Sequence, residues 1–333
     1  MASIDPVLQL GNGMNSPDDV WYSDSDGSVL VGEHGDGHIS LITADGKLAR
    51  LAQVVPQAEG IAQIAGVTYV ADQAHNRVVA LTATGLRTVL QLTPDPAGLN
   101  LDGIWVDAKG SGLVVPDSPH GTVLFVDTSG HVTRTVAGFS RPAGVFAGLD
   151  GQYLVADENA GAVFALGQTG GPHRLFGGLP GVDDVVQDVA GDRHIFAILP
   201  NSGRLVDLTA GTNLATGLRN PQGLAFDGAG NLLVAESDNG RLDLVVRGFA
   251  LEAPAGVAQL VPGQSVCLTV LRAPGLTGTL SVDSTSNAAY TSGPIASDMV
   301  EVRPEPCRAA SCTATVTVRG GAGLEIAEFA YRD

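Results

Sequence analysis

The sequence predicts an all-β protein in which a six-bladed β-propeller is followed by a small β-sandwich-like domain. Three observations lead to this fold class. Short apolar segments alternate with turn residues throughout the 333 residues, which include 44 glycines and 18 prolines. A strand–turn–strand pattern occurs six times at a period of about 41 residues. The pattern ends near residue 248, where the composition of the chain changes.

Two markers define each copy of the repeat. The first is an apolar strand that ends in an acid and leads through a polar turn into another apolar strand, as in VADQAHNRVVAL. The acid that ends the first strand is Glu33, Asp72, Asp117, Asp157 and Glu236 in five of the copies. In the fifth copy Leu199 takes its place. The second marker lies upstream and reads SPDDVW, AEGIAQI, LDGIWVD, PAGVFAG, VDDVVQD and PQGLAFD. Four short strands in about 40 residues are typical of a propeller blade, and blades bury their faces only in a closed ring.

The N-terminal segment is expected to close this ring. VLQLGNGMNSPDD resembles TVLQLTPDPAGLNLDG between copies two and three, so residues 7–10 have the pattern of a last strand without its preceding strands. The sixth copy ends near Arg247, before such a strand. We therefore predict a propeller over residues 1–248, with the N-terminal strand completing blade six, and a small all-β accessory domain over residues 249–333.

Several segments resemble known propeller families. NPQGLAFDGAGNLLVAESDNGRL and VADQAHNRVVAL are similar to NHL repeats, and this resemblance covers roughly residues 5–248. LDGIWVD and RPAGVF resemble, more distantly, the senescence marker/gluconolactonase family, and virginiamycin B lyase-like propellers are another distant match. The resemblance implies a six-bladed propeller and leaves function open, because propellers host hydrolases, lyases and non-catalytic binders.

The acids of the first marker are predicted to be structural. A carboxylate at the end of a strand can accept hydrogen bonds from backbone N–H groups of the following turn. It can also pair with an arginine in the same hairpin, such as Arg77 or Arg241. The NHL pattern has an acid at this position as a structural element.

The second marker contains a different set of acids. In each copy one residue precedes the turn glycine, or the aspartate that replaces this glycine. This residue is acidic in four of the six copies, as Asp18, Glu59, Asp102 and Asp183. It lies near the start of the innermost strand, so these side chains are expected to face the propeller axis. Carboxylates that converge on a narrow space repel one another, so they take up protons or bind a cation. Solvated acids at the mouth of the funnel are the alternative interpretation.

The gluconolactonase resemblance implies an axial divalent metal held from these inner-strand positions. It nominates Glu59 and Asp102 as ligands, with Asp18 and Asp183, and Ca²⁺ is the expected ion, with Mg²⁺ or Zn²⁺ as alternatives. This sequence departs from the family pattern, since the asparagine before glycine is replaced by Ala143 and Gln222.

Three of the seven histidines, His34, His75 and His120, occupy equivalent turns in the first three copies. Three imidazoles near carboxylates could bind zinc or transfer protons, so His75 and His120 join Glu59 and Asp102 as candidate catalytic residues. Solvated turn histidines are the alternative. The sequence contains no GxSxG, HExxH or phosphate-loop motif.

Charge and hydropathy restrict the partners and the location. The net charge of -17 repels phosphate backbones, so no nucleic-acid partner is expected. No run of 18 apolar residues occurs, so no membrane insertion is expected. The start MASIDPVLQL lacks the features of a signal peptide. The protein is expected to be secreted or extracytoplasmic if a signal peptide has been removed, and cytoplasmic otherwise.

The C-terminal segment has the alternation of short strands, separated by linkers rich in Pro, Gly and Ser. It contains all three cysteines, Cys267, Cys307 and Cys312. A disulfide between Cys307 and Cys312, a disulfide from Cys267 to either of them, and three free thiols all remain open.

The leading functional hypothesis is an enzyme of lactonase (hydrolase) or lyase type that acts on a small molecule in the axial funnel, with a divalent cation as Lewis acid. The alternative is a non-catalytic NHL-type module that binds a ligand or a protein partner. Stabilisation by metal ions distinguishes the two.

Overall fold

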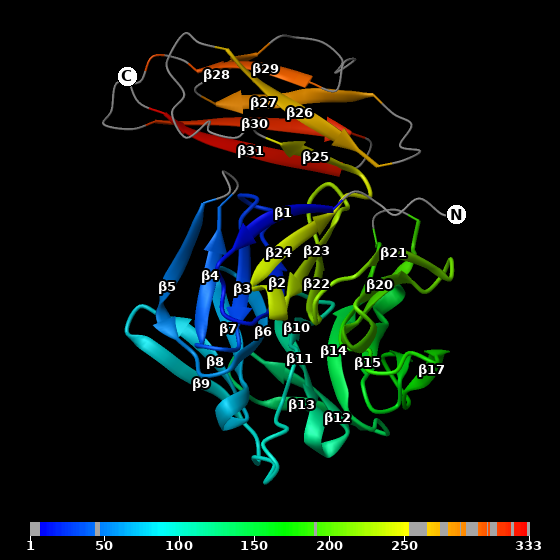
Figure 1. The fold of residues 1–333 in the computed structure, drawn as a ribbon. Coiled ribbons are helices and arrows are strands. Elements are labelled where there is room, and N and C mark those ends of the chain that lie inside the picture. The colour runs from blue at the N-terminus through cyan, green and yellow to red at the C-terminus, as the bar shows by residue number, and fades with distance from the viewer. Residues whose placement is uncertain are drawn as a thin grey trace.

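The structure is a computed structural model, and it describes residues 7–43, 47–189, 192–252, 265–273, 279–286, 288–290, 299–304, 306, 312–320 and 323–331. These residues form eight sheets, of which six are four-stranded blades of a propeller and two form a C-terminal sandwich (Figure 1). No helix among the described residues is long and apolar enough to cross a membrane.

Five blades are continuous in the sequence, and each runs from an inner to an outer strand. The first two contain β2 (Pro17–Tyr22), β3 (Val29–Glu33), β4 (His38–Ile42), β5 (Leu48–Val54), β6 (Ala58–Ile64), β7 (Val67–Asp72), β8 (Arg77–Thr82) and β9 (Gly85–Gln91). The third and fourth contain β10 (Trp105–Val106), β11 (Gly112–Asp117), β12 (Thr122–Asp127), β13 (Val132–Ala137), β14 (Pro142–Ala147), β15 (Tyr153–Asp157), β16 (Ala162–Leu166) and β17 (His173–Gly177). The fifth contains β18 (Val185–Gln187), β19 (Ile195–Leu199), β20 (Arg204–Asp207) and β21 (Thr212–Thr216).

The sixth blade combines both ends of the propeller sequence. It contains β22 (Pro221–Phe226), β23 (Leu232–Glu236), β24 (Arg241–Val245) and, as its outermost strand, β1 (Val7–Asn12). Strand β1 pairs antiparallel with β24 from Val7 opposite Val245 to Asn12 opposite Arg241. This pairing is the one that the repeated VLQL segment predicts. It covers the edge of β24 and joins the first and last blades without a covalent link.

The inner strands β2, β6, β10, β14, β18 and β22 contact one another in cyclic order, which closes the ring. Hydrophobic cores lie between neighbouring blades, and the largest joins blades four, five and six around Phe196 and Ile198. Short 3₁₀ turns connect strands within the blades: η1 (Gln73–His75), η2 (Ser118–His120), η3 (Leu149–Gly151), η4 (Pro200–Ser202) and η5 (Ser237–Asn239).

The acids of the first marker have the predicted structural role. Glu33, Asp72, Asp157 and Glu236 are fully buried. The Asp157 carboxylate accepts hydrogen bonds from the backbone N–H groups of residues 140, 141 and 160, at 2.6, 2.9 and 3.0 Å. Asp72 accepts from the Nε of Arg77 at 2.7 Å. Asp157 and Glu236 bind the loop before the inner strand as well as the turn that follows them, so each of these two acids holds three segments of its blade together.

The C-terminal sandwich has one sheet of four strands and one of three. Its strands are β25 (Phe249–Glu252), β26 (Val266–Arg272), β27 (Leu280–Ser286), β28 (Ala288–Tyr290), β29 (Met299–Pro304), β30 (Cys312–Gly320) and β31 (Gly323–Tyr331). Leu268 and Val300 from one sheet pack against Leu280 and Val316 from the other. Cys267 is a free, exposed thiol on β26. Since Cys267 is free, neither of the predicted alternatives that pair it with another cysteine is formed. Cys307 and the side chain of Cys312 lie outside the described residues, and so does the predicted disulfide between them.

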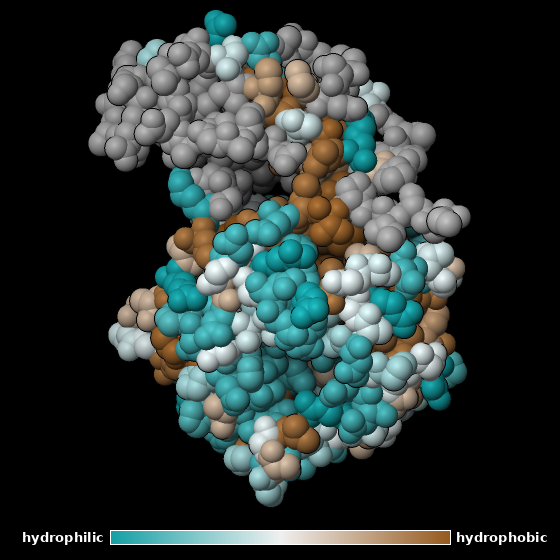
Figure 2. Space-filling model, viewed as in Figure 1, coloured by the Kyte–Doolittle hydropathy of each residue, from teal (hydrophilic) through white to brown (hydrophobic). Residues whose placement is uncertain are grey.

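A buried asparagine joins the propeller to the sandwich. The Asn231 Oδ1 accepts hydrogen bonds from the backbone N–H groups of Arg247 and Gly248, both at 3.0 Å, and its Nδ2 donates to the Phe249 carbonyl at 2.8 Å. Phe249 packs into the sandwich core, whereas Ala250 packs between blades one and six. Figure 2 shows a hydrophobic strip between the two parts, with mostly hydrophilic residues over the visible propeller surface.

Candidate axial cation site

Backbone irregularities direct the side chains of the second marker toward the axis. The pairing of the first two strands shifts register between Pro17 and Val20 in blade one and between Ala58 and Ile61 in blade two. Blades four and six have the same shift. A β-bulge turns side chains out of the regular alternation of a strand. Asp18 and Glu59 lie in these bulges, which explains how they leave the packed faces of their blades.

Three of the four predicted ligands meet at one point on the axis. Carboxylate oxygens of Asp18, Glu59 and Asp102 all lie within 4.8 Å of one another. Glu59 is 5% exposed and Asp102 is 8% exposed. The Glu59 carboxyl interacts with the carboxyls of both Asp18 and Asp102, so ionisation of one member of the cluster opposes ionisation of the others. These residues come from three successive blades, so no single blade could form the cluster.

The electrostatics of the cluster favour neutralisation by protons or by a cation. Burial raises the pKa of Glu59 well above its usual value, and the negative charges of Asp18 and Asp102 raise it further. Burial, followed by the charges of Asp102 and Asp18, likewise raises the pKa of Asp183. Asp183 contributes to the same negative potential, although its carboxylate is not part of the group within 4.8 Å.

Two basic side chains contact the edge of the cluster. The Arg141 guanidinium lies 3.0 Å from an Asp102 oxygen and 2.5 Å from a Glu158 oxygen, so its single charge is shared. The His34 Nε2 lies 3.4 Å from a Glu59 oxygen, and its side chain is 34% exposed. Full ionisation of the axial carboxylates would therefore leave several negative charges without compensation.

A cavity with the size of one small ligand adjoins the acid cluster, and Glu59 is not among the residues that line it. Asp18, Asp102 and Asp183 line an axial cavity of about 20 Å³, and one water needs roughly 10–15 Å³ measured in this way. The ligand atoms on offer are carboxylate oxygens, which Ca²⁺ and Mg²⁺ prefer over softer donors. The residues present therefore fit a hard divalent cation, with Asp18, Glu59 and Asp102 as its ligands.

Two further aspartates have a role that sequence analysis did not identify. Asp19 and Asp184 occupy the position of the turn glycine in blades one and five. The Asp19 carboxylate accepts from the Ile61 N–H of blade two at 2.9 Å, and Asp184 accepts from the Leu224 N–H of blade six at 2.9 Å. In three other blades a glycine N–H donates to a backbone carbonyl of the next blade: Gly60 to Asp102, Gly103 to Ala143 and Gly144 to Asp183. The aspartates thus replace a backbone link between blades by a side-chain link.

The predicted histidine trio is divided among different carboxylates. The His75 Nδ1 lies 2.8 Å from Asp72, and the His120 Nδ1 lies 2.8 Å from Asp117. Both pair with structural acids of their own blades. His34 is the member of the trio that contacts an axial acid. The position of His34 in the turn after Glu33 indicated a possible contact with a carboxylate. The sequence did not show that this carboxylate would be Glu59 of the next blade.

Comparison with solved structures shows the propeller fold. Regucalcin from Agrobacterium tumefaciens, described as a calcium-binding protein, is 17% identical over 74% of this chain and 95% of its own, with a TM-score of 0.59. A gluconolactonase from Xanthomonas campestris is 16% identical over 72% of this chain and 88% of its own, with a TM-score of 0.58. Virginiamycin B lyase from Staphylococcus aureus is 16% identical over 72% of this chain and 97% of its own, with a TM-score of 0.56.

No protein-family description and no curated protein matches the chain. The solved structures therefore confirm the resemblance to gluconolactonase-like and lyase-like propellers at the level of fold. The more specific resemblance to NHL repeats stays a prediction.

Proposed function

We propose that this protein is a divalent-cation-dependent enzyme of lactonase or lyase type, with its reaction centre at the axial acid cluster. The observation that carries the proposal is the convergence of Asp18, Glu59 and Asp102 within 4.8 Å from three blades, with Arg141 as a shared counter-charge. A structural role for this cluster is a poor explanation, because buried carboxylates that face one another cost stability.

The residues around the cluster divide into three roles. Asp18, Glu59 and Asp102 hold the cation, which when bound supplies a Lewis acid for an ester or lactone carbonyl. Asp183 is the proton acceptor, because no described residue donates a hydrogen bond to its carboxylate and burial raises its pKa, which makes the carboxylate a stronger base. His34, half-exposed beside Glu59, moves protons between the cluster and solvent.

The functions of the similar proteins support this choice of reaction class. One is a gluconolactonase, one is described as calcium-binding, and the lyase has been solved with quinupristin. All three share the propeller fold, and the cluster supplies the acidic ligands that calcium needs. The ligand in this protein is accordingly a small molecule with a carbonyl that can be polarised.

The test combines cation binding with activity. Purified protein is freed of metal with EDTA, and its melting temperature is measured with Ca²⁺, Mg²⁺ or Zn²⁺ added. A cation at 100 times its Kd stabilises the folded state by about 2.7 kcal/mol. The double variant Glu59→Gln/Asp102→Asn should lose this stabilisation. The matched variant His75→Gln, at a residue that pairs with Asp72 instead, should retain it.

The same samples are assayed for hydrolysis of a panel of aldonolactones and for elimination from cyclic esters. Activity that requires the cation and falls at least 100-fold in Asp183→Asn supports the proposal. A melting temperature indifferent to all three cations contradicts the metal site. Cation binding without turnover of any substrate would favour the alternative, a propeller that binds a ligand or a protein partner.

A further inference from the structure

A cavity separate from the acid cluster lies toward the other end of the inner strands. It has a volume of about 590 Å³, which is within the usual range for small-molecule sites. Trp21 and Phe226 line it from the ends of β2 and β22. Asp18 lies three residues before Trp21, which corresponds to about 10 Å along a strand. Trp105 is among the lining residues of both this cavity and the small axial one.

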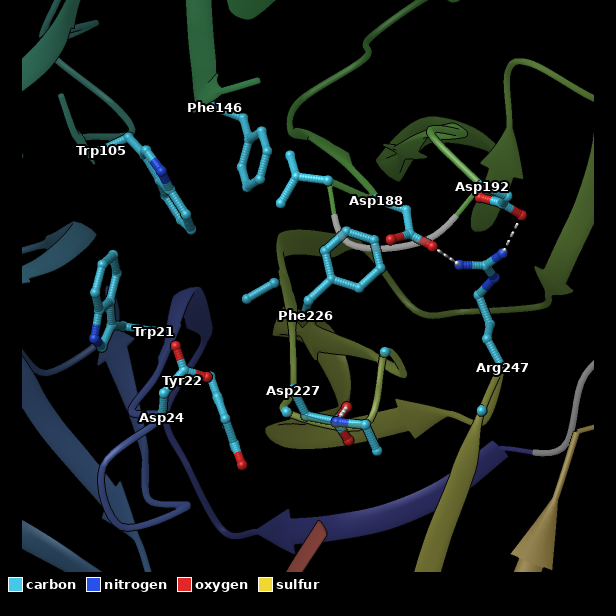
Figure 3. A pocket seen from close by; sticks show the side chains of 16 residues that line it. Trp21, Tyr22, Asp24, Trp105, Phe146, Asp188, Asp192, Phe226, Asp227 and Arg247 are labelled. Atoms are coloured by element: carbon cyan, nitrogen blue, oxygen red, sulfur yellow. Dashed lines mark hydrogen bonds and ion pairs between the residues drawn. The ribbon is translucent and has the colours of Figure 1, made fainter. Parts of the chain in front are cut away.

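One wall of the cavity is aromatic. The Trp21 and Trp105 rings lie 5.1 Å apart between centroids at an interplanar angle of 51°, and Trp105 and Phe146 lie 5.0 Å apart at 44°. Phe226 completes the wall and packs edge-on against Phe196 at 5.9 Å. Figure 3 shows the rings of Trp21, Trp105, Phe146 and Phe226 around a common open space. These rings come from four different blades and present their faces and edges to a ligand.

The rest of the lining is rich in acids. Four aspartates line the cavity, and Arg247 is the single basic residue among its lining residues. Its guanidinium is already compensated, because it lies 3.8 Å from Asp188 and 3.4 Å from Asp192, as Figure 3 shows. It also stacks on the Phe196 ring at 4.1 Å. Asp227 accepts hydrogen bonds within its own turn, from Ala229 and Asn231.

Asp24 is different from the other three acids. It is exposed at the rim, next to Tyr22, and no described residue forms a hydrogen bond or ion pair with its carboxylate. The cavity thus combines aromatic rings with an excess of negative charge and one carboxylate that has no protein partner. Aromatic faces attract cations through their quadrupole, and they do not attract anions.

We propose that this cavity binds an organic cation, with an apolar body against Trp21, Trp105 and Phe146 and an ammonium group held by the ring faces and by Asp24. A protonated amine or a quaternary ammonium on an aromatic or branched alkyl body satisfies both parts of the lining. The site is distinct from the axial acid cluster, because Asp18, Glu59 and Asp102 do not line it.

The chain offers a direct reporter for this site, because its two tryptophans both line the cavity. The probe is benzyltrimethylammonium, compared with the uncharged neopentylbenzene and with an anion of similar size, benzylsulfonate. Tryptophan fluorescence should change saturably with the cation, and the uncharged analogue should bind roughly tenfold more weakly. Binding should be the same in EDTA and in Ca²⁺, so failure of the axial cation site would not affect this result.

Two variants test the assignment of the two parts of the lining. Asp24→Asn, at an exposed position, should weaken binding of the cation several-fold and leave the uncharged analogue unchanged. Trp21→Ala should abolish binding while Trp105 still reports, and calorimetry confirms the loss independently of fluorescence. Asp238→Asn is the matched control, since Asp238 is an exposed acid of blade six outside the cavity. Equal binding of the cation and the uncharged analogue, stronger binding of the anion, or full binding by both variants would overturn the proposal.

Discussion

Asp19 should make the stability of the cation-free protein depend on pH. Its carboxyl is 8% exposed and links blades one and two through the Ile61 N–H. Burial raises its pKa from 3.8 to about 7, against the lowering effect of its hydrogen bonds from Ile61 and Val20. The folded state therefore binds a proton that the unfolded state releases between pH 3.8 and 7. The stabilisation from this proton is complete below pH 3.8 and is lost as the pH rises through 7.

The magnitude follows from the size of the shift. Each pKa unit corresponds to about 1.4 kcal/mol, so a rise from 3.8 to about 7 is on the order of 4 kcal/mol of unfolding free energy. In the wild type the two carboxylate oxygens of Asp19 accept separately from the N–H groups of Val20 and Ile61. The variant Asp19→Asn removes the titration, but its single amide oxygen can replace only one of these two acceptors. That loss costs about 1–3 kcal/mol at every pH.

The assay is urea unfolding of both proteins at pH 5, 7 and 8.5 with EDTA present. Asp19→Asn should be less stable than the wild type at pH 5, and the difference should vanish or reverse at pH 8.5. Asp150→Asn, at an exposed turn position, is the control and should follow the wild type throughout. A constant difference between Asp19→Asn and the wild type across this range would refute the reasoning.

Three further predictions concern stability. In urea unfolding, Asp157→Ala should lower the unfolding free energy by roughly 3 kcal/mol or more, since three buried N–H groups lose their acceptor. Asp183→Asn should lower it only slightly. Equal losses in the two variants would mean that the structural and axial acids have been confused. Asn231→Ala should destabilise the protein and expose the junction to proteolysis near residue 250, because two N–H groups and one carbonyl lose their partner; unchanged protease resistance would argue against this role. A chain ending at residue 252 should retain a cooperative melt, because Ala250 packs on the propeller; loss of the folded state would show that the sandwich is part of the propeller core.

The repeat in the sequence was sufficient to predict most of the fold. Strand alternation, turn glycines and the acid that ends the first strand of each marker are local features, and their period gives the blade. The pairing of the N-terminal strand with the last blade could also be predicted, because the same VLQL pattern occurs twice, whereas its register came from the structure. The structural role of Asp72 and Asp157 followed from their position at the end of a strand before a turn.

The partners of the site residues were decided by the tertiary structure. The contacts of Glu59 with Asp18 and Asp102 connect blades that are about 40 residues apart, and so do those of Arg141 with Asp102. The period of the repeat shows that such residues occupy equivalent positions in their blades. It does not show which neighbours their side chains reach, because this depends on the bulges in the inner strands and on the rotation between blades.

The aromatic cavity illustrates the same limit. Trp21, Trp105 and Phe146 each follow the second-marker position by three residues, so a periodic signal was present in the sequence. Read locally, it has the pattern of core residues on a strand. In the closed ring Phe146 is 7% exposed in the core, and Trp21 and Trp105 pack against the core while partly buried, yet all three also line a cavity of about 590 Å³. The sequence by itself therefore determined the blades and their number, and the geometry of the closed ring determined which residues face the axis and the cavity.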